Sequence, residues 1–346
     1  MQIQALSPAC IAALLASGAA VACALILGFL LKTGLAWRLA TDIPNARSLH
    51  TRPTPRVGGW GLVPAVVVAM LLFTPSLRVV AACALALAAL SQIDDRRGLS
   101  ARVRFGAHVA AVAVVVAGYP AAVPWWVLAL TGFLLVWLVN LYNFMDGADG
   151  LAGGMALFGF GAYAIAALGA GRPMPELAWA SAALAGAAAG FLIFNFHPAK
   201  VFLGDAGSIS IGFLAGAFGY WGWREHAWPF WFPAMVFAPF IGDASVTLAR
   251  RLLRGEKFWQ AHREHYYQRM VQLGVGHART ALLWYAVMLA GIALALWGRM
   301  RPPAVQWGAI AVWAIVLILA GARVDRQWRH FRATLNSNTE VNADAS

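Results

Sequence analysis

Two aspartates three residues apart stand out in the polar segment 140–154, which lies between apolar runs that are almost free of charge. Charged side chains beside lipid hydrocarbon are costly and usually functional. The segment also contains Asn143, and a glycine follows each of Asp146 and Asp149, so the backbone can turn sharply or approach a ligand closely. Carboxylate and amide oxygens are ligands for hard cations. The combination predicts a site for Mg²⁺ and a phosphate; the alternative is a solvated Asp-Gly turn.

A second acidic pair, Asp94 and Asp95, closes the apolar run 77–93 and directly precedes two arginines. Two adjacent acids at a helix C-terminus oppose the helix dipole, so a compensating charge is expected there. A divalent cation or a proton to be moved would provide it. In the simpler alternative, the acids pair with the neighbouring arginines.

A third polar segment, 195–208, carries Asp205 between two glycines, and Ser208 is in a position to cap the next helix. A backbone site for an anion beside a metal-binding acid is therefore a candidate arrangement. Lys200 of this segment is also what a loop on the cytoplasmic side of a membrane normally contains, and for this residue alone we favour that interpretation.

Basic residues follow in the segment 250–279, where His262, His265 and Arg269 would share one face of a helix. Imidazolium and guanidinium groups are suited to binding a pyrophosphate. We favour a pyrophosphate site over a zinc site because cysteine ligands are missing. The alternative is a basic amphipathic loop on anionic lipid. Asp243 lies inside an apolar run, where an acid needs a partner that the sequence does not identify.

The elements that must position these residues are membrane helices. Apolar residues make up 61% of the 346 residues, charged residues 12%, and the mean hydropathy is +0.68. This composition excludes a soluble globular protein. The net charge of +12 comes from short loops beside the apolar runs, so we expect no nucleic acid partner. The three cysteines lie in apolar runs and imply neither disulfides nor a thiolate metal cluster.

Eleven apolar runs of spanning or near-spanning length predict an all-α, polytopic integral membrane protein with about 11 transmembrane helices. The runs are 8–31, 58–74, 77–93, 105–118, 123–143, 151–169, 177–195, 208–223, 228–249, 280–298 and 304–322. The first lacks a charged start and a cleavage site, which favours a membrane helix over a signal peptide. We expect one membrane-embedded catalytic domain over 1–332 and a disordered polar tail over 333–346.

The distribution of Lys and Arg predicts the orientation. With the C-terminus cytoplasmic, the segments on that side hold 21 of the 26 basic residues, so the positive-inside rule places the N-terminus in the periplasm. The cytoplasmic loops would then be 32–57, 94–104, 144–150, 197–207 and 250–279. Every segment with chemically unusual residues lies on this side, which predicts one active site at the cytoplasmic face.

These segments, in this order, resemble the polyprenyl-phosphate N-acetylhexosamine-1-phosphate transferases of glycosyltransferase family 4. That superfamily includes undecaprenyl-phosphate GlcNAc-1-phosphate transferases and phospho-MurNAc-pentapeptide translocase. The matching segments are Pro44–His50, Pro53–Gly59, Asp94–Ser100, Asn143–Gly154, Pro198–Ser208 and His262–His265. The chain is expected to have eleven spans and lacks a run of three histidines. In both respects it is more similar to the branch that initiates O-antigen synthesis than to the translocase.

The resemblance implies that undecaprenyl phosphate attacks the β-phosphorus of a UDP-N-acetylhexosamine, giving undecaprenyl-diphospho-sugar and UMP. This would be the first membrane step of O-antigen or another cell-envelope polysaccharide, at the bacterial inner membrane. The donor would be UDP-GlcNAc or a 6-deoxy sugar such as UDP-FucNAc or UDP-QuiNAc. Relatives are often dimers, so a homodimer is a further expectation.

The resemblance also implies roles for individual residues. The cofactor would be Mg²⁺, with Mn²⁺ as a substitute, held by Asp205 with the help of Asp94, Asp95 or Asp146, which are also the catalytic candidates. The expected substrate-binding residues are Asn143 and Asp149 for the nucleotide, Phe202 for uracil, Arg104 for the lipid phosphate, and Lys200, His262, His265 and Arg269 for phosphates or sugar. Whether Asp94 deprotonates the lipid phosphate or an aspartate first takes the phosphosugar covalently stays open.

A secondary transporter of an anionic substrate is the competing hypothesis. It would need acids and broken helices near the middle of the membrane, usually in repeated halves. Most acids here are predicted at one interface, and the sequence contains no evident repeat. The enzyme is therefore the favoured interpretation.

Overall fold

The computed structural model describes residues 6–44, 48–257 and 262–344, and side chains as far as residue 334. It is almost entirely helical, as predicted; the described strands are the short antiparallel pair β1 (Thr41–Asp42) and β2 (Thr54–Pro55). The α-helices are α1 Pro8–Lys32, α2 Leu35–Leu39, α3 Gly58–Phe73, α4 Arg78–Arg97, α5 Ala101–Gly118, α6 Trp125–Phe144, α7 Leu151–Leu168, α8 Pro175–Asn195, α9 Asp205–Arg224, α10 Trp231–Val236, α11 Ala238–Leu253, α12 Tyr266–Met270, α13 His277–Gly298 and α14 Pro303–Asp344.

Each of the eleven predicted apolar runs coincides with a helix, except that the ninth is divided between α10 and α11. Within the described residues, eight helices are long and apolar enough to cross a membrane. They are α1, α4 together with the turn before it, α5, α6, α7, α8, α13 and α14. The chain is therefore a multi-pass helical membrane protein, while the count of eleven spans stays a prediction.

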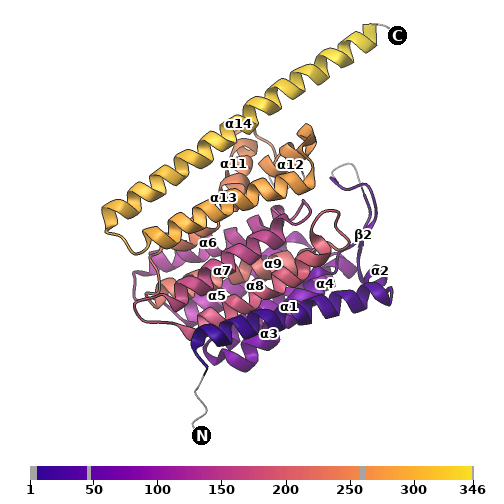
Figure 1. Ribbon diagram of the computed structural model, residues 1–346. Coiled ribbons are helices and arrows are strands. Elements are labelled where there is room, and N and C mark those ends of the chain that lie inside the picture. The colour runs from indigo at the N-terminus through magenta and orange to yellow at the C-terminus, as the bar shows by residue number, and fades with distance from the viewer. Residues whose placement is uncertain (1–5, 45–47, 258–261, 345–346) are drawn as a thin grey trace.

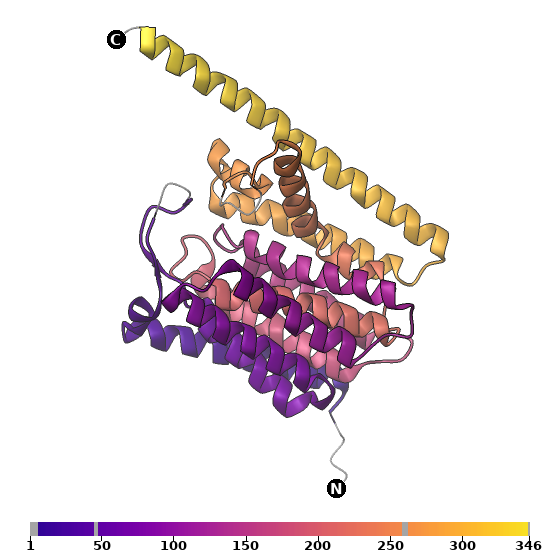
Figure 2. The ribbon, with the colours of Figure 1, turned by 180° about the vertical axis from the view of Figure 1, so that it is seen from behind.

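The helices run side by side, with α7, α8 and α9 in the centre, α1 and α3 on one side and α13 and α14 on the other (Figure 1). The most apolar stretches of α7 and α8 are 72% buried, whereas that of α14 is only 11% buried. The view from behind shows the same layers (Figure 2). An apolar but exposed outer helix is the expected arrangement where lipid replaces water.

The central helices approach their neighbours closely because their sequences are rich in small residues. A Cβ added at Gly186 of α8 would lie 1.9 Å from the carbonyl oxygen of Ala16 in α1. Small residues at such contacts let backbones pack tightly in a membrane, where dispersion forces replace the hydrophobic effect. This packing places the helix ends that carry the polar segments.

Local sequence explains several helix ends. The Ser7 hydroxyl accepts the Cys10 amide at 3.2 Å at the start of α1, and the Ser100 hydroxyl accepts the Val103 amide at the start of α5. At the C-terminal end, α14 continues to Asp344 and includes most of the tail that we expected to be disordered. Extending an existing helix avoids the cost of nucleation, which accounts for the difference.

Candidate active site

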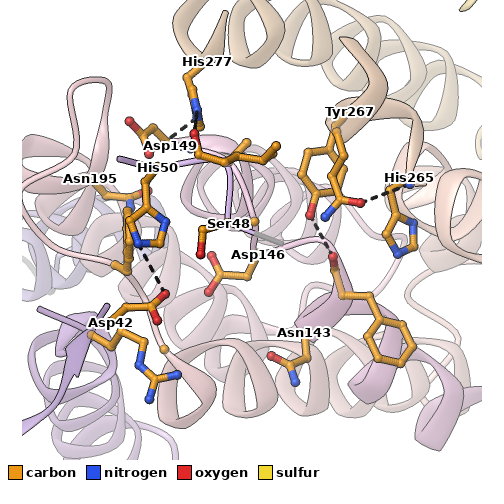
Figure 3. Close-up of a pocket in the computed structure, with 18 of the residues that line it drawn as sticks. Asp42, Ser48, His50, Asn143, Asp146, Asp149, Asn195, His265, Tyr267 and His277 are labelled. Carbon is orange, nitrogen blue, oxygen red and sulfur yellow. Dashed lines mark hydrogen bonds and ion pairs between the residues drawn. The ribbon is translucent and has the colours of Figure 1, made fainter. Parts of the chain in front are cut away.

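A cavity of about 410 Å³ has residues of β1 and α12 in its lining (Figure 3). These elements lie at the end of the bundle away from the N-terminus (Figure 1). The cavity lining comes from four stretches that are far apart in the sequence, within 42–56, 143–149, 195–205 and 262–277. Four of the five predicted polar loops therefore contribute to one cavity. The fifth, 94–104, does not line it, but it contacts a residue that does, as described below.

Asp146 and Asp205 line the cavity from near the C-terminal end of α6 and the N-terminal end of α9. Asp146 lies two residues after the last residue of α6, and Asp205 is the first residue of α9. The Ser208 hydroxyl donates to the Asn143 side-chain oxygen at 2.8 Å and so ties the two helices together. The Gly204 backbone hydrogen-bonds to the Asp146 carboxylate. Gly204 has a φ of +72°, a conformation that favours glycine, which explains its place before the acid.

The electrostatics of this pair favour a bound cation. Burial raises the pKa of Asp146 well above its ordinary value, and the negative charge of Asp205 raises it further. The Gly204 hydrogen bond and the positive charge of Arg56 lower this pKa, but they compensate only in part. Two carboxylates with an amide oxygen nearby are a ligand set that fits Mg²⁺, which binds few protein oxygens and keeps water as its remaining ligands.

Asp94 and Asp95 do not line the cavity. The Asp94 carboxylate accepts the Leu99 amide at 2.6 Å and the Arg104 guanidinium at 3.0 Å. Asp95 pairs with Arg56 at 3.3 Å, and Arg56 itself lines the cavity. The acids are thus paired with arginines, as the simpler alternative supposed, although not with their immediate neighbours. The segment 94–104 joins the site through Arg56.

Asp149 lines the cavity but is enclosed by hydrogen bonds. Its carboxylate is 2.6 Å from His197 Nδ1 and accepts the Ala199 amide at 3.1 Å. His277 Nδ1 accepts the Asp149 amide at 3.3 Å, and His277 Nε2 donates to the Leu49 carbonyl at 3.2 Å. Asp149 therefore holds three segments of the cavity wall together.

Within the described ranges, Asp149, His197 and His277 are the one group of three metal-type ligands whose atoms lie within 4.8 Å of one another. The lone pair of His277 Nδ1 is already used by the Asp149 amide, and the two imidazole rings stack at 5.3 Å. Hydrogen bonds thus account for this group without a metal. Asp94, Asp146 and Asp205 do not form such a preassembled group.

The aromatic and imidazole candidates Phe202, His262 and His265 all line the cavity. Phe202 lines the cavity, and its ring meets that of His50 in a T-shaped contact with the ring centroids 4.9 Å apart. His262 and His265 also line it, from outside the helices. Burial, with the nearby charges of His265 and Arg251, lowers the pKa of His262 to about 4.

Three predicted substrate-binding residues lie outside the cavity lining. Lys200 is exposed, and Arg104 is engaged by Asp94. Arg269 is only 7% exposed and pairs with Asp325 of α14 at 2.8 Å. The prediction that Arg269 shares a helical face with His262 and His265 is wrong, because α12 begins at Tyr266 and His262 is not in a helix.

Several lining residues escaped the motif analysis, notably His277, Arg56, His50 and Tyr267. Arg56 and His50 stand in matching segments but had no assigned role, and Asn45 to Arg47 of the first segment lie outside the described residues. A signal for His277 was its place in a polar loop directly before the apolar run 280–298.

The helices and the acidic cavity at their ends define a polytopic membrane protein with a site suited to a metal and phosphates. Glycosyl transferase family 4 matches residues 77–222 of the chain. A decaprenyl-phosphate N-acetylglucosaminephosphotransferase of Mycobacterium tuberculosis is 31% identical over an alignment of 341 residues that covers 82% of this chain and 83% of the relative.

Two other relatives agree. A probable undecaprenyl-phosphate N-acetylglucosaminyl 1-phosphate transferase of Bacillus subtilis is 28% identical, over 72% of this chain and 74% of the relative. An undecaprenyl-phosphate alpha-N-acetylglucosaminyl 1-phosphate transferase of Yersinia pestis is 29% identical, over 83% and 85%. The chain belongs to the polyprenyl-phosphate N-acetylhexosamine-1-phosphate transferase superfamily.

Proposed function

We propose that the protein transfers N-acetylhexosamine-1-phosphate from a UDP-sugar to undecaprenyl phosphate at the cytoplasmic face of a bacterial inner membrane. An oxygen of the lipid phosphate forms a bond to the β-phosphorus of the donor, the bond from that phosphorus to the bridging oxygen breaks, and UMP leaves. UDP-GlcNAc is the first donor to test, because the relatives are named for N-acetylglucosamine. Synthesis of O-antigen or a similar polysaccharide would consume the product.

The observation that carries this proposal is the placement of Asp146 and Asp205 with Asn143 in one cavity, beside Phe202 and the two imidazoles. The three oxygen-bearing side chains would hold Mg²⁺, which when bound supplies positive charge to the donor phosphates. Phe202 would pack on the uracil, and His262 and His265 would contact the pyrophosphate or the sugar. Both reactants are anions, so such positive charge is needed to offset their repulsion.

The lipid phosphate would approach beside Asp94 and Arg104. The Arg104 side chain is 41% exposed although it pairs with Asp94, so the side chain stays partly accessible. A guanidinium can bind a phosphate through two parallel hydrogen bonds, which suits a lipid headgroup arriving at the membrane surface.

The test is UMP release by the purified protein from UDP-GlcNAc with undecaprenyl phosphate and Mg²⁺. We expect release that requires all three, and none from Asp205→Asn protein that is folded and inserted normally. Full activity of Asp205→Asn would refute the metal assignment. A lack of any UMP release by the wild type, with UDP-GlcNAc and with UDP-FucNAc, UDP-QuiNAc and UDP-GalNAc, would refute the function.

The same assay separates the two chemical routes. A burst of UMP in the absence of undecaprenyl phosphate, equal to the amount of enzyme, would indicate a covalent phosphosugar on an aspartate. Strict dependence on the lipid from the first turnover would indicate direct displacement.

A further inference from the structure

Asp243 is a buried carboxylate that the proposed chemistry does not use. It lies in α11, and only 1% of its side chain is exposed. The four groups that donate hydrogen bonds to it are the Tyr266 amide at 2.9 Å, the Tyr267 amide at 3.1 Å, His265 Nδ1 at 3.1 Å and the Thr247 hydroxyl at 3.2 Å. An ionised carboxylate, which accepts at both oxygens, matches this set of donors.

His265 and Tyr267 both line the cavity, and His265 is the one of the two whose side chain contacts Asp243. With Asp243 as the acceptor, Nδ1 of His265 carries the proton and Nε2 carries none. The plane of the ring is set by near-parallel stacking on Tyr267 at 5.9 Å and Phe144 at 6.3 Å. Figure 3 shows His265 and Tyr267 near each other at the cavity.

We propose that Asp243 is a positioning residue that holds the His265 ring with Nδ1 protonated and Nε2 directed to the transferred phosphate. The hydrogen bond at one imidazole nitrogen determines the tautomer and so the role of the other nitrogen. The same carboxylate accepts the two amides that begin α12, so it also places the backbone next to His265. The inference rests on the proposed function for its kinetic test but not for its structural one.

The kinetic test compares four variants of the full-length enzyme with UDP-GlcNAc and undecaprenyl phosphate. Asp243→Asn should lower kcat by about 10- to 100-fold while KM for the donor changes much less. Thr247→Val is the matched control, because it removes a donor to the same carboxylate without touching His265, and its kcat should stay within about twofold. In an His265→Gln background, Asp243→Asn should cause little further loss.

An Asp243→Asn enzyme as active as Thr247→Val would overturn the proposal, as would an equal loss in the His265→Gln background. If Asp243→Asn does not fold, wild-type protein labelled with ¹⁵N-histidine decides the matter, with His265→Gln used to assign the resonance. We expect Nδ1 of His265 to be protonated; an unprotonated Nδ1 overturns the proposal. This measurement needs no turnover, so it stays informative even if the protein proves inactive with UDP-GlcNAc.

Discussion

Arg250 of α11 and Asp325 of α14 form a bidentate ion pair, with both N···O distances at 2.8 Å. Arg269 joins the same carboxylate at 2.8 Å and the Tyr266 hydroxyl donates to it at 3.1 Å. These contacts tie α14 to the segment that follows His265. Two residues of that segment, Tyr267 and Gln268, line the cavity. Arg269 is thus engaged with α14 and lies outside the cavity lining.

Breaking this contact should cost stability. Asp325→Asn removes the nearer of the two carboxylates that face the buried guanidinium of Arg269, because Glu264 is 3.9 Å from it. We expect about 3 kcal/mol of destabilisation, at the lower end for breaking a buried ion pair, because Asp325 is partly exposed. Arg254→Gln is the control, since its ion pairs are on the surface and should contribute less than about 1 kcal/mol. Unfolding of the two variants in detergent checks this, and equal midpoints would contradict it.

Close packing of α1 and α8 gives a second prediction. Gly186→Ala would place a Cβ 1.9 Å from the Ala16 carbonyl oxygen, and a helix backbone cannot move aside cheaply, so we expect a loss of about 1–3 kcal/mol. Gly161 of α7 has no atom within 4 Å of an added Cβ. Gly161→Ala should leave the unfolding midpoint unchanged or raise it, because alanine favours helix by about 1 kcal/mol. A Gly186→Ala protein as stable as wild type would mean that the helices are not this close.

Cation binding should be visible in stability as well as in activity. In EDTA, Asp146→Asn should unfold at a higher temperature than wild type, because it removes one of two carboxylates that repel each other. Millimolar Mg²⁺ should raise the unfolding temperature of the wild type but not that of the variant. Glu225→Gln, at the other end of the bundle, should respond to Mg²⁺ as wild type does. A full Mg²⁺ response in Asp146→Asn would argue against its role as a ligand.

The depressed pKa of His262 predicts a dependence of stability on pH. The folded protein binds this proton only near pH 4, whereas the unfolded chain binds it near 6.5. Between these values the unfolded state holds more protons, so stability falls as the pH drops from about 6.5 to 4. His262→Gln should reduce that fall, measured as the change in unfolding temperature over this range without substrate. An identical fall in both proteins would show that His262 titrates normally.

The helices and the position of the polar segments were predictable from the sequence, because hydropathy and helix length act locally. Asp146 and Asp205 could be picked from the sequence as candidate site residues, because carboxylates beside apolar runs need a function or a partner. Their placement in one cavity followed from assigning every polar segment to one end of the helices.

Only the tertiary structure could show which charged and polar side chains pair with one another. Asp94 with Arg104, Arg269 with Asp325, and Asp243 with His265 are contacts whose members are 10 to 56 residues apart. The rotation of each helix about its axis determines which side chains meet, and that rotation depends on the packing of small residues such as Gly186 against neighbouring backbones. Hydropathy and spacing along one chain carry no information about this rotation. Sequence reasoning therefore predicted that Arg269 contacts the substrate, whereas in the structure it pairs with Asp325 of α14.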